Sequence, residues 1–303
     1  MKNMTTPQQL HIPVLLDDVL EILDPHLGER YLDLTAGYGG HARRIIRQIG
    51  SAELATLCDR DNYAIKHLTD LASQGATLIQ SDYLTAVERL SRDGQTFDMI
   101  LLDLGVSSPQ LDQGDRGFSF LRDGPLDMRM DRNQKLTAAD IVNHSSESDI
   151  ISILENYGEI SSAQARTLAR TIVIRRKKQP FVTTADLAET VRLKIGELDH
   201  GRYHKTHPAT KVFQALRIAV NDELEQLKRT LPLLNEILNH GGRLGIITFH
   251  SLEDRIVKEF LKDQSDGMDA PYSLLLKKPI AGNINDVFNP RARSAKLRAA
   301  CKK

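Results

Sequence analysis

The sequence predicts an α/β protein, in which a parallel β-sheet carries helices on both faces and an all-helical segment is inserted into the chain. Three observations predict this fold class. Short apolar strands alternate with helices from about residue 30 to residue 105, as in a parallel sheet. The residues from about 137 to 200 have helical spacing without a strand pattern. Another strand and helix follow near residue 240, so the chain returns to complete the sheet.

The first part of the sheet consists of four apolar strands and the helices that connect them. We expect strands at 30–35, 52–59, 76–82 and 97–105, and helices at 39–50, 62–75 and 83–94. Gly50 marks the end of the first helix, while Asn62 and Gly75 are the expected N-cap and C-cap of the second.

The second part begins with a loop that is rich in Gly, Ser, Pro and Asp, at 105–135. Helices are then expected at 138–144, 148–158, 162–178 and 183–196, followed by one long helix at 209–238. A fifth strand at 241–249, a helix at 251–263 and a closing hairpin of strands at 272–278 and 295–301 complete the pattern. This order predicts one discontinuous domain, 1–114 with 211–303, and an inserted helical domain at 115–210.

Composition narrows the class of protein. The chain has 303 residues, of which 41% are hydrophobic, and no apolar run is long enough to span a membrane. Its first residues, MKNMTTPQQLHIP, lack the apolar core of a signal peptide. Cys58 and Cys301 are the two cysteines, too few for a disulfide framework. We therefore expect a reduced, cytoplasmic protein with no membrane partner, and the sequence predicts no oligomeric state.

The charge distribution indicates a polyanionic partner. The net charge is zero, but each of the segments 163–178 and 291–303 contains six cations and no acid. Arg166, Arg170 and Lys177 fall on one face of the helix expected at 162–178. Such clusters are typical of contacts with nucleic-acid phosphates, although a run of charge is also typical of a solvated helix face.

The glycine-rich turn after the first strand predicts a cofactor site. Gly37, Gly39 and Ala42 fit the dinucleotide pattern G-x-G-x-x-G/A, and Asp59 follows Gly39 by 20 residues. Asp33, ahead of the glycines, fits instead the pattern of S-adenosylmethionine enzymes. A glycine turn lets either ligand approach the backbone. The turn therefore leaves both cofactors open, together with a tight turn that binds nothing.

The residues after the fourth strand favour the methyl donor. Asp103 ends that strand, at the edge where open α/β sheets bind ligands. Ser107, Ser108, Pro109 and Gln110 then resemble the Ser/Asp-Pro-Pro-aromatic loop of methyltransferases that act on exocyclic amines, with Gln110 in place of the aromatic residue. A dehydrogenase needs a His or Lys beside its hydride site, and this segment supplies neither.

Six long blocks resemble the ribosomal RNA small-subunit methyltransferase H family. They extend from His11 to Arg298 in the order of that family, and they read HIPVLLDDVL, DLTAGYGGHA, DLGVSSPQLDQGDRGFSFLRDGPLDMRMD, HPATKVFQALRIAVNDELE, GGRLGIITFHSLEDRIVKEF and NPRARSAKLR. The resemblance implies a Rossmann-like S-adenosylmethionine-dependent methyltransferase sheet with an inserted all-helical domain that recognises RNA. It also implies methyl transfer to the N4 amine of a cytidine in the decoding region of 16S rRNA, the position usually numbered 1402, within the small ribosomal subunit.

The resemblance also implies which residues contact the cofactor. Ala42 replaces the serine that is usual in the family, and this change removes no ligand. The cofactor-binding positions that carry over are Gly39, Gly40, His41, Asp59, Tyr83, Asp103 and Gln110.

Methylation of a cytosine amine requires an acceptor for the amine protons, because the nitrogen lone pair is delocalised into the ring. Carboxylates accept hydrogen bonds from this amine. We therefore predict that Ser108 and Pro109 hold the amine with Asp103 nearby, and that positioning supplies most of the rate without a metal.

Several histidines and one basic segment have two interpretations each. His250 faces the base pocket or is structural, and Ser251 is the expected cap of the helix that follows it. The cluster of His200, His204 and His207 lacks the fourth ligand of a typical zinc site. In the segment 291–303, Arg293 contacts RNA or closes over the cofactor.

Three other functions use the same residues. They are a methyltransferase for another nucleic-acid amine, such as one in DNA, an NAD-dependent oxidoreductase, and an assembly factor of the ribosome without enzymatic activity.

Overall fold

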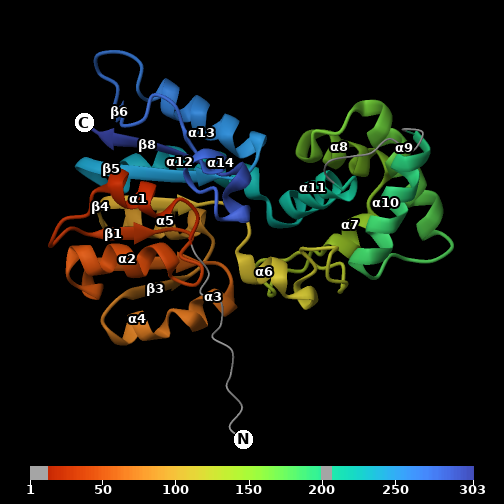
Figure 1. Ribbon diagram of the computed structural model, residues 1–303, viewed down its shortest axis with the longest axis horizontal. Helices are drawn as coiled ribbons and strands as arrows, with labels where there is room; N and C mark the ends of the chain where they lie inside the picture. Colours follow the sequence, from red (N-terminus) through yellow and green to blue (C-terminus); the bar gives the residue numbers. More distant parts are fainter. Residues whose placement is uncertain (1–12, 199–206) are drawn as a thin grey trace, which may run out of the picture. The chain divides into compact units, whose positions relative to one another are not determined.

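The computed structural model describes residues 13–198 and 207–303 (Figure 1). The chain forms two compact units, of which the first contains the residues up to Gly105 and from Glu225, and the second contains Val106–Leu224. These boundaries differ from the expected 114/115 and 210/211, because Val106, Leu111 and the helix that follows residue 207 all pack against the core of the second unit. Among the described residues, no helix is long and apolar enough to cross a membrane.

The first unit is built on one eight-stranded sheet. Its strand order is β3-β2-β1-β4-β5-β8-β6, and β7 pairs with β8. Strands β1 to β5 are parallel, as predicted, while β6 and β7 are antiparallel to β8. The bounds are Tyr31–Asp33, Ala55–Asp59, Thr77–Gln80, Phe97–Asp103, Leu238–Thr248, Tyr272–Leu274, Ile280–Ala281 and Lys296–Lys302 for β1 to β8.

The register brings the acidic ends of three strands to one edge of the sheet. Asp33 ends β1, Asp59 ends β2 and Asp103 ends β4. In β1, Asp33 pairs in register with Leu57 of β2 and Leu101 of β4, two residues before each of those strands ends. The carboxyl edge of this sheet is therefore lined by acids.

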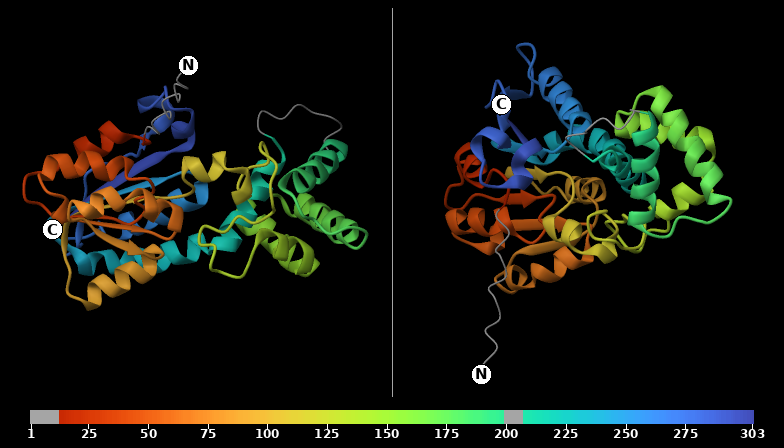
Figure 2. Two further views of the ribbon diagram at one scale, coloured as in Figure 1. Left: turned by 90° about the horizontal axis from the view of Figure 1, so that it is seen from below. Right: turned by 45° about the vertical axis from the view of Figure 1, so that its right-hand side comes forward.

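Helices cover both faces of the sheet, as the sequence predicts (Figures 1 and 2). Alternate residues of β1 point to opposite faces, with Tyr31 in one apolar cluster and Leu32 in the other. The first cluster contains residues of α1, α2 and α4, and the second contains residues of α5, α12 and α13. The helices of this unit are α1 Leu16–Leu23, α2 Gly40–Ile49, α3 Asn62–His67, α4 Thr69–Ser73, α5 Tyr83–Arg92, α12 Glu223–Ile237, α13 Ser251–Asp263 and α14 Gly282–Asn285.

Two predicted helices are interrupted. The expected helix at 62–75 is divided into α3 and α4 at Leu68, and its N-cap is Asp61, whose side chain accepts the Tyr63 N–H, and not Asn62. The expected helix at 209–238 ends at Asn221 because Asp222 adopts a left-handed φ of 52°, after which α12 begins. Helical spacing continues through both breaks, so the sequence pattern does not reveal them.

The second unit is helical around its own core. The core residues come mainly from α7, α8, α9, α10 and α11, with Phe118, Leu126 and Met128 from the loop before them. The helices are α6 Ser108–Asp112, α7 Ala138–His144, α8 Glu147–Gly158, α9 Ser162–Arg176, α10 Thr184–Leu198 and α11 Ala209–Asn221. Within the described residues of both units, short 3₁₀ helices lie at Ala52–Leu54, Gly114–Arg116 and Pro290–Ser294.

The C-terminal strands pair as predicted, but they do not form a simple hairpin. β6 pairs with the end of β8, where Tyr272 lies opposite Lys302. Between them the chain forms β7, α14 and the 3₁₀ helix Pro290–Ser294. This excursion takes the chain back to the carboxyl edge, since Lys296 lies opposite Thr248, the last residue of β5.

Candidate active site

The loop between β1 and α2 is shaped by glycines. Gly37 and Gly39 have φ values of 53° and 80°, in the left-handed region that favours glycine. The Gly39 N–H donates to the carbonyl of Ala36, whose own N–H donates to Cys58 in β2 (both 2.8 Å). A Cβ atom on Gly39 would lie 2.8 Å from Leu68 Cδ2. The glycines are therefore needed for the turn itself as well as for access to the backbone.

Asp59 ties this loop to the end of β2. Its Oδ2 accepts the Gly37 N–H and its Oδ1 accepts the Asp61 N–H, both at 2.8 Å. Burial raises the pKa of Asp59 to about 6, although these two hydrogen bonds oppose the rise. Each oxygen retains a lone pair, so the carboxylate can also accept a hydroxyl group of a ligand.

Asp33 lies beneath the same loop and is 2% exposed. The Tyr31 hydroxyl donates to its Oδ2 (2.8 Å), and the Thr35 N–H donates to its Oδ1 (3.2 Å). Burial raises the pKa of Asp33 to about 7; these two hydrogen bonds oppose the rise, and the charge of Asp59 adds to it. The sequence drew attention to Asp33 as part of a pattern but did not place it among the site residues.

Asp103 stands at the end of β4, and it is the least satisfied acid of this edge. Its N–H donates to Thr35 Oγ1 (2.6 Å). Its Oδ2 lies 3.8 Å from Nδ1 of His41, but its Oδ1 is buried and has no hydrogen-bond partner in the described chain. Burial, followed by the charges of Asp33 and Glu253, raises the pKa of Asp103 well above its ordinary value. A buried, unpaired carboxylate oxygen is costly unless a ligand donates to it.

His41 is held by the segment before α1. Its Nε2 lies 3.0 Å from the carbonyl oxygen of Val14, and the side chain is 6% exposed. The imidazole therefore has a fixed position between Val14 and Asp103.

The remaining predicted site residues lie in two places. Tyr83 is the first residue of α5 and is half-buried against the second apolar cluster of the first unit. Ser108, Pro109 and Gln110 belong to α6 of the second unit. Gln110 Oε1 accepts the Ser107 N–H (2.9 Å) in a capping box, so this side chain also has a structural role. Its contact with the cofactor stays a prediction.

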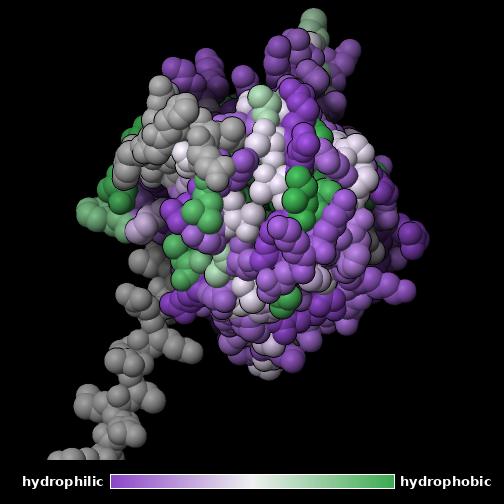
Figure 3. Space-filling model, turned by 90° about the vertical axis from the view of Figure 1, so that its right-hand side faces the viewer, coloured by the Kyte–Doolittle hydropathy of each residue, from purple (hydrophilic) through white to green (hydrophobic). Residues whose placement is uncertain are grey.

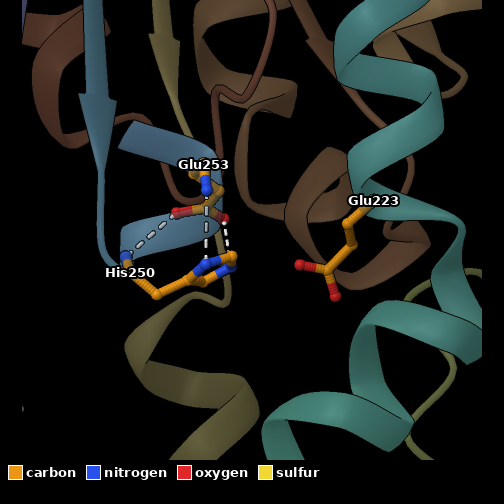
Figure 4. Close-up of side chains that lie close together, drawn as sticks. All are labelled: Glu223, His250 and Glu253. Carbon is orange, nitrogen blue, oxygen red and sulfur yellow. Dashed lines mark hydrogen bonds and ion pairs between the residues drawn. The ribbon is translucent and has the colours of Figure 1, made fainter. Parts of the chain in front are cut away.

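His250 has a structural role, because it caps α13. Glu253 donates its N–H to His250 Nδ1 (3.4 Å), and the Glu253 carboxylate accepts the His250 N–H (3.3 Å; Figure 4). The same carboxylate accepts the Phe249 N–H (2.8 Å). The prediction that Ser251 caps this helix is wrong, since Ser251 is its first residue. Glu223, also drawn in Figure 4, belongs to the second unit, where it accepts hydrogen bonds from Arg217 (2.7 and 2.8 Å).

The histidine cluster near residue 200 is only partly described. His200 and His204 lie outside the described residues. His207 Nδ1 accepts the Ala209 N–H (3.2 Å), and its ring lies 4.6 Å from that of Phe120. These contacts place His207 at the start of α11, as part of its local packing.

The charge of the sheet edge separates the two cofactors that the glycine turn left open. Asp33, Asp59 and Asp103 converge there. The charge of Asp59 raises the pKa of Asp33, and the charge of Asp33 raises the pKa of Asp103. In the described residues, neither Asp33 nor Asp103 forms an ion pair with Lys or Arg. A bound pyrophosphate, as in NAD, would raise these pKa values further, whereas the sulfonium and ammonium groups of S-adenosylmethionine would lower them and pair with the ionised carboxylates.

Comparison with known protein families shows the family to which the chain belongs. The model of the MraW methylase family matches residues 8–303. The chain belongs to the MraW methylase family. Membership confirms the predicted fold class, an S-adenosylmethionine-dependent methyltransferase sheet, and its cofactor.

Named relatives of this methylase family match over nearly the whole chain. A protein from Synechocystis sp., named ribosomal RNA small subunit methyltransferase H, is 46% identical over 296 residues, which are 96% of this chain and 92% of the relative. A protein of the same name from Methylococcus capsulatus is 43% identical over 95% of this chain and 99% of the relative. A solved structure of an rRNA methylase from Streptococcus thermophilus aligns over 99% of both chains at 10% identity, with a TM-score of 0.41.

Proposed function

We propose that this methylase transfers a methyl group from S-adenosylmethionine to the N4 amine of a cytidine in the decoding region of 16S rRNA, at the position usually numbered 1402. The observation that carries the proposal is the buried Asp103 Oδ1, which has no partner in the described chain and lies at the edge of the cofactor loop. The names of the relatives support rRNA of the small subunit as the substrate. The amine is the group that would donate to the unpaired oxygen.

The residues at the sheet edge suit the cofactor. We assign the amino-acid end of the cofactor to the loop of Gly39, Gly40 and His41, and its ribose hydroxyls to Asp59. Tyr83, Asp103 and Gln110 complete the proposed set. When bound, S-adenosylmethionine supplies a methyl group on a positively charged sulfur, which the surrounding acids favour.

Asp103 has the properties of a proton acceptor for the amine. Burial and the neighbouring charges of Asp33 and Glu253 raise its pKa, so its carboxylate holds a proton more tightly than an ordinary aspartate does and is the stronger base. By accepting from the amine, Asp103 would direct the nitrogen lone pair toward the methyl group. Ser108 and Pro109, five and six residues later in the chain, are proposed to hold the amine.

The second unit is proposed to contact the RNA. Arg166, Arg170 and Lys177 at α9 are exposed and form no ion pair within the described residues. The side of the molecule shown in Figure 3, to which this unit contributes, is mostly hydrophilic, with small and separate apolar spots. An exposed, unpaired set of cations suits phosphate contacts.

Methyl transfer to defined acceptors tests this function. Small ribosomal subunits from cells that lack the gene are incubated with radiolabelled S-adenosylmethionine, and the labelled nucleoside is identified after digestion. We expect the label in N4-methylcytidine. Label in another nucleoside, or in DNA offered in parallel, would show that the substrate is a different amine.

A further inference from the structure

The segment from α14 to the 3₁₀ helix Pro290–Ser294 exposes a large aromatic side chain among cations. Phe288 is 98% exposed, and the neighbouring Ile284 and Val287 are also exposed. Arg291 and Arg293 follow within five residues and are exposed as well. We call residues 282–294 the C-terminal platform. Neither the proposed cofactor site nor the basic helix of the second unit includes it.

The C-terminal platform is held firmly on the first unit. The Leu15 N–H donates to Asp286 Oδ2 (3.0 Å), and Asn285 donates to Asp18 (3.0 Å). The Gly282 N–H donates to the Ala295 carbonyl (2.9 Å), and a Cβ on Gly282 would lie 2.0 Å from the Ala292 carbonyl oxygen. Phe288 is therefore exposed on a loop that hydrogen bonds and close packing hold in place, and not on a frayed chain end.

Its location is next to the proposed active site. The platform leads into Lys296, which lies opposite the last residue of β5 at the carboxyl edge. Asp286 binds the backbone of Leu15, and the adjacent Val14 carbonyl contacts His41, which stands beside Asp103. Figure 1 shows α14 at the end of the sheet where β8 begins, away from the C-terminus.

The charged residues around Phe288 indicate which kind of partner would bind over it. Asp286 is the one acid within residues 282–294, and its carboxylate already accepts from Leu15 and Asn289. Arg293 has no ion-pair partner among the residues that the structure describes. A second copy of this chain would bring the same cations to the contact, whereas an RNA strand brings phosphates and bases that stack on aromatic rings.

We propose that Phe288 stacks on an unpaired base of the substrate RNA close to the methylated nucleotide, while Arg293 contacts its phosphate. This inference rests on the proposed function, because it takes rRNA as the substrate. A cytidine in folded RNA must be splayed out of its stack to be methylated, and an exposed ring beside the proposed active site replaces a lost stacking contact for the neighbouring base.

Binding of a fluorescein-labelled, single-stranded RNA of the decoding-region sequence, followed by fluorescence anisotropy, tests this platform. Phe288→Ala should weaken binding about tenfold, which is about 1.4 kcal/mol. Phe288→Trp should bind as the wild type does, and Arg293→Ala should lower the dependence of log affinity on log salt by about 0.7. Met268→Ala is the matched control: Met268 is also 98% exposed, but it lies before β6, at the opposite edge of the sheet.

Three results would overturn the inference. One is RNA binding by Phe288→Ala at the affinity of the wild type. Another is full affinity of Phe288→Leu, which keeps an apolar side chain without a ring. A third is a change of sedimentation coefficient in Phe288→Ala without a change in RNA affinity, which would assign this face to a second copy. If Phe288→Ala weakens RNA binding but the wild type forms no N4-methylcytidine, the platform stands and the proposed reaction fails.

Discussion

The carboxyl edge of the sheet and the exposed face of α9 carry opposite charges, and they differ in how those charges are held. At the sheet edge, Asp33 and Asp59 are fixed by backbone N–H groups, and burial raises their pKa values. On α9, Arg166 and Arg170 project into solvent without an ion pair in the described chain. A fixed, buried set of acids suits a small ligand that must be oriented, and a solvated set of cations suits a polymer held at many points.

Within α9 itself the same distinction separates the cations. Arg175 pairs with Asp186, and Arg176 donates to the Val142 carbonyl (2.8 Å), so both stabilise the second unit. The exposed cations earlier in the helix have no such role. Some cations of α9 therefore have a structural role, and only its exposed cations are expected to contact RNA.

Among substitutions at the acidic edge, removal of the Asp59 carboxylate is expected to cause the largest loss of cofactor affinity. Asp59→Ala should weaken S-adenosylmethionine binding on the order of 10- to 100-fold, because hydrogen bonds to a charged group contribute about 1.5–3 kcal/mol. Isothermal titration calorimetry measures the affinity. The substitution also leaves the Gly37 and Asp61 N–H groups without acceptors, so the free energy of unfolding should fall too.

Asp98 provides the matched control for this loss of stability. It accepts the Arg30 N–H (2.8 Å) and an Asn239 N–H (2.7 Å) near the start of β4, at the opposite edge. Asp98→Ala should be destabilised without a change in cofactor affinity. Equal affinities of the two variants would remove Asp59 from the cofactor site.

Neutralising the exposed cations of α9 tests the other region. The double variant Arg166→Ala with Arg170→Ala should bind small subunits about tenfold more weakly at low salt, and its salt dependence should be less steep by about 1.5. Arg192→Ala is the control, since Arg192 on α10 already pairs with Glu189 (2.7 Å). Filter binding over a range of salt concentrations measures both quantities, and identical slopes for all three proteins would contradict the phosphate role.

The smallest functional effect is expected at Asp33, where the change concerns stability and its dependence on pH. The pKa of about 7 in the folded protein exceeds the usual 3.8. Ionisation therefore costs stability progressively as the pH rises from about 4 to about 7, and the full cost is present above that range. Asp33→Asn lacks this cost, so it should gain about 1–3 kcal/mol relative to the wild type between about pH 5 and pH 8.

Urea unfolding at several pH values measures this difference. The asparagine side chain introduced by Asp33→Asn keeps an oxygen that can accept from Tyr31 or Thr35, which limits the loss of hydrogen bonds. A difference in unfolding free energy that does not vary with pH would show that Asp33 has an ordinary pKa.

The sequence predicted the parts of this molecule that follow from local pattern. Alternating apolar strands and glycine turns placed Asp59 and Asp103 at the ends of their strands, and a parallel sheet then brings them to one edge. The break at Asp222 was not predicted, because it is a single left-handed residue in a continuous helical pattern. The capping role of His250 and the burial of Asp33 depend on contacts made in the folded chain, which spacing does not encode.

The most direct test of the account is the rate of methyl transfer by Asp103→Asn. The substitution keeps the shape of the side chain but replaces the carboxylate whose Oδ1 lacks a partner in the described chain. With subunits from cells that lack the gene as the acceptor, we expect kcat to fall about 100-fold or more, and S-adenosylmethionine affinity measured by calorimetry to fall much less. Asp98→Asn should retain the wild-type kcat. A wild-type kcat in Asp103→Asn would contradict the assignment of Asp103 as the acceptor for the amine.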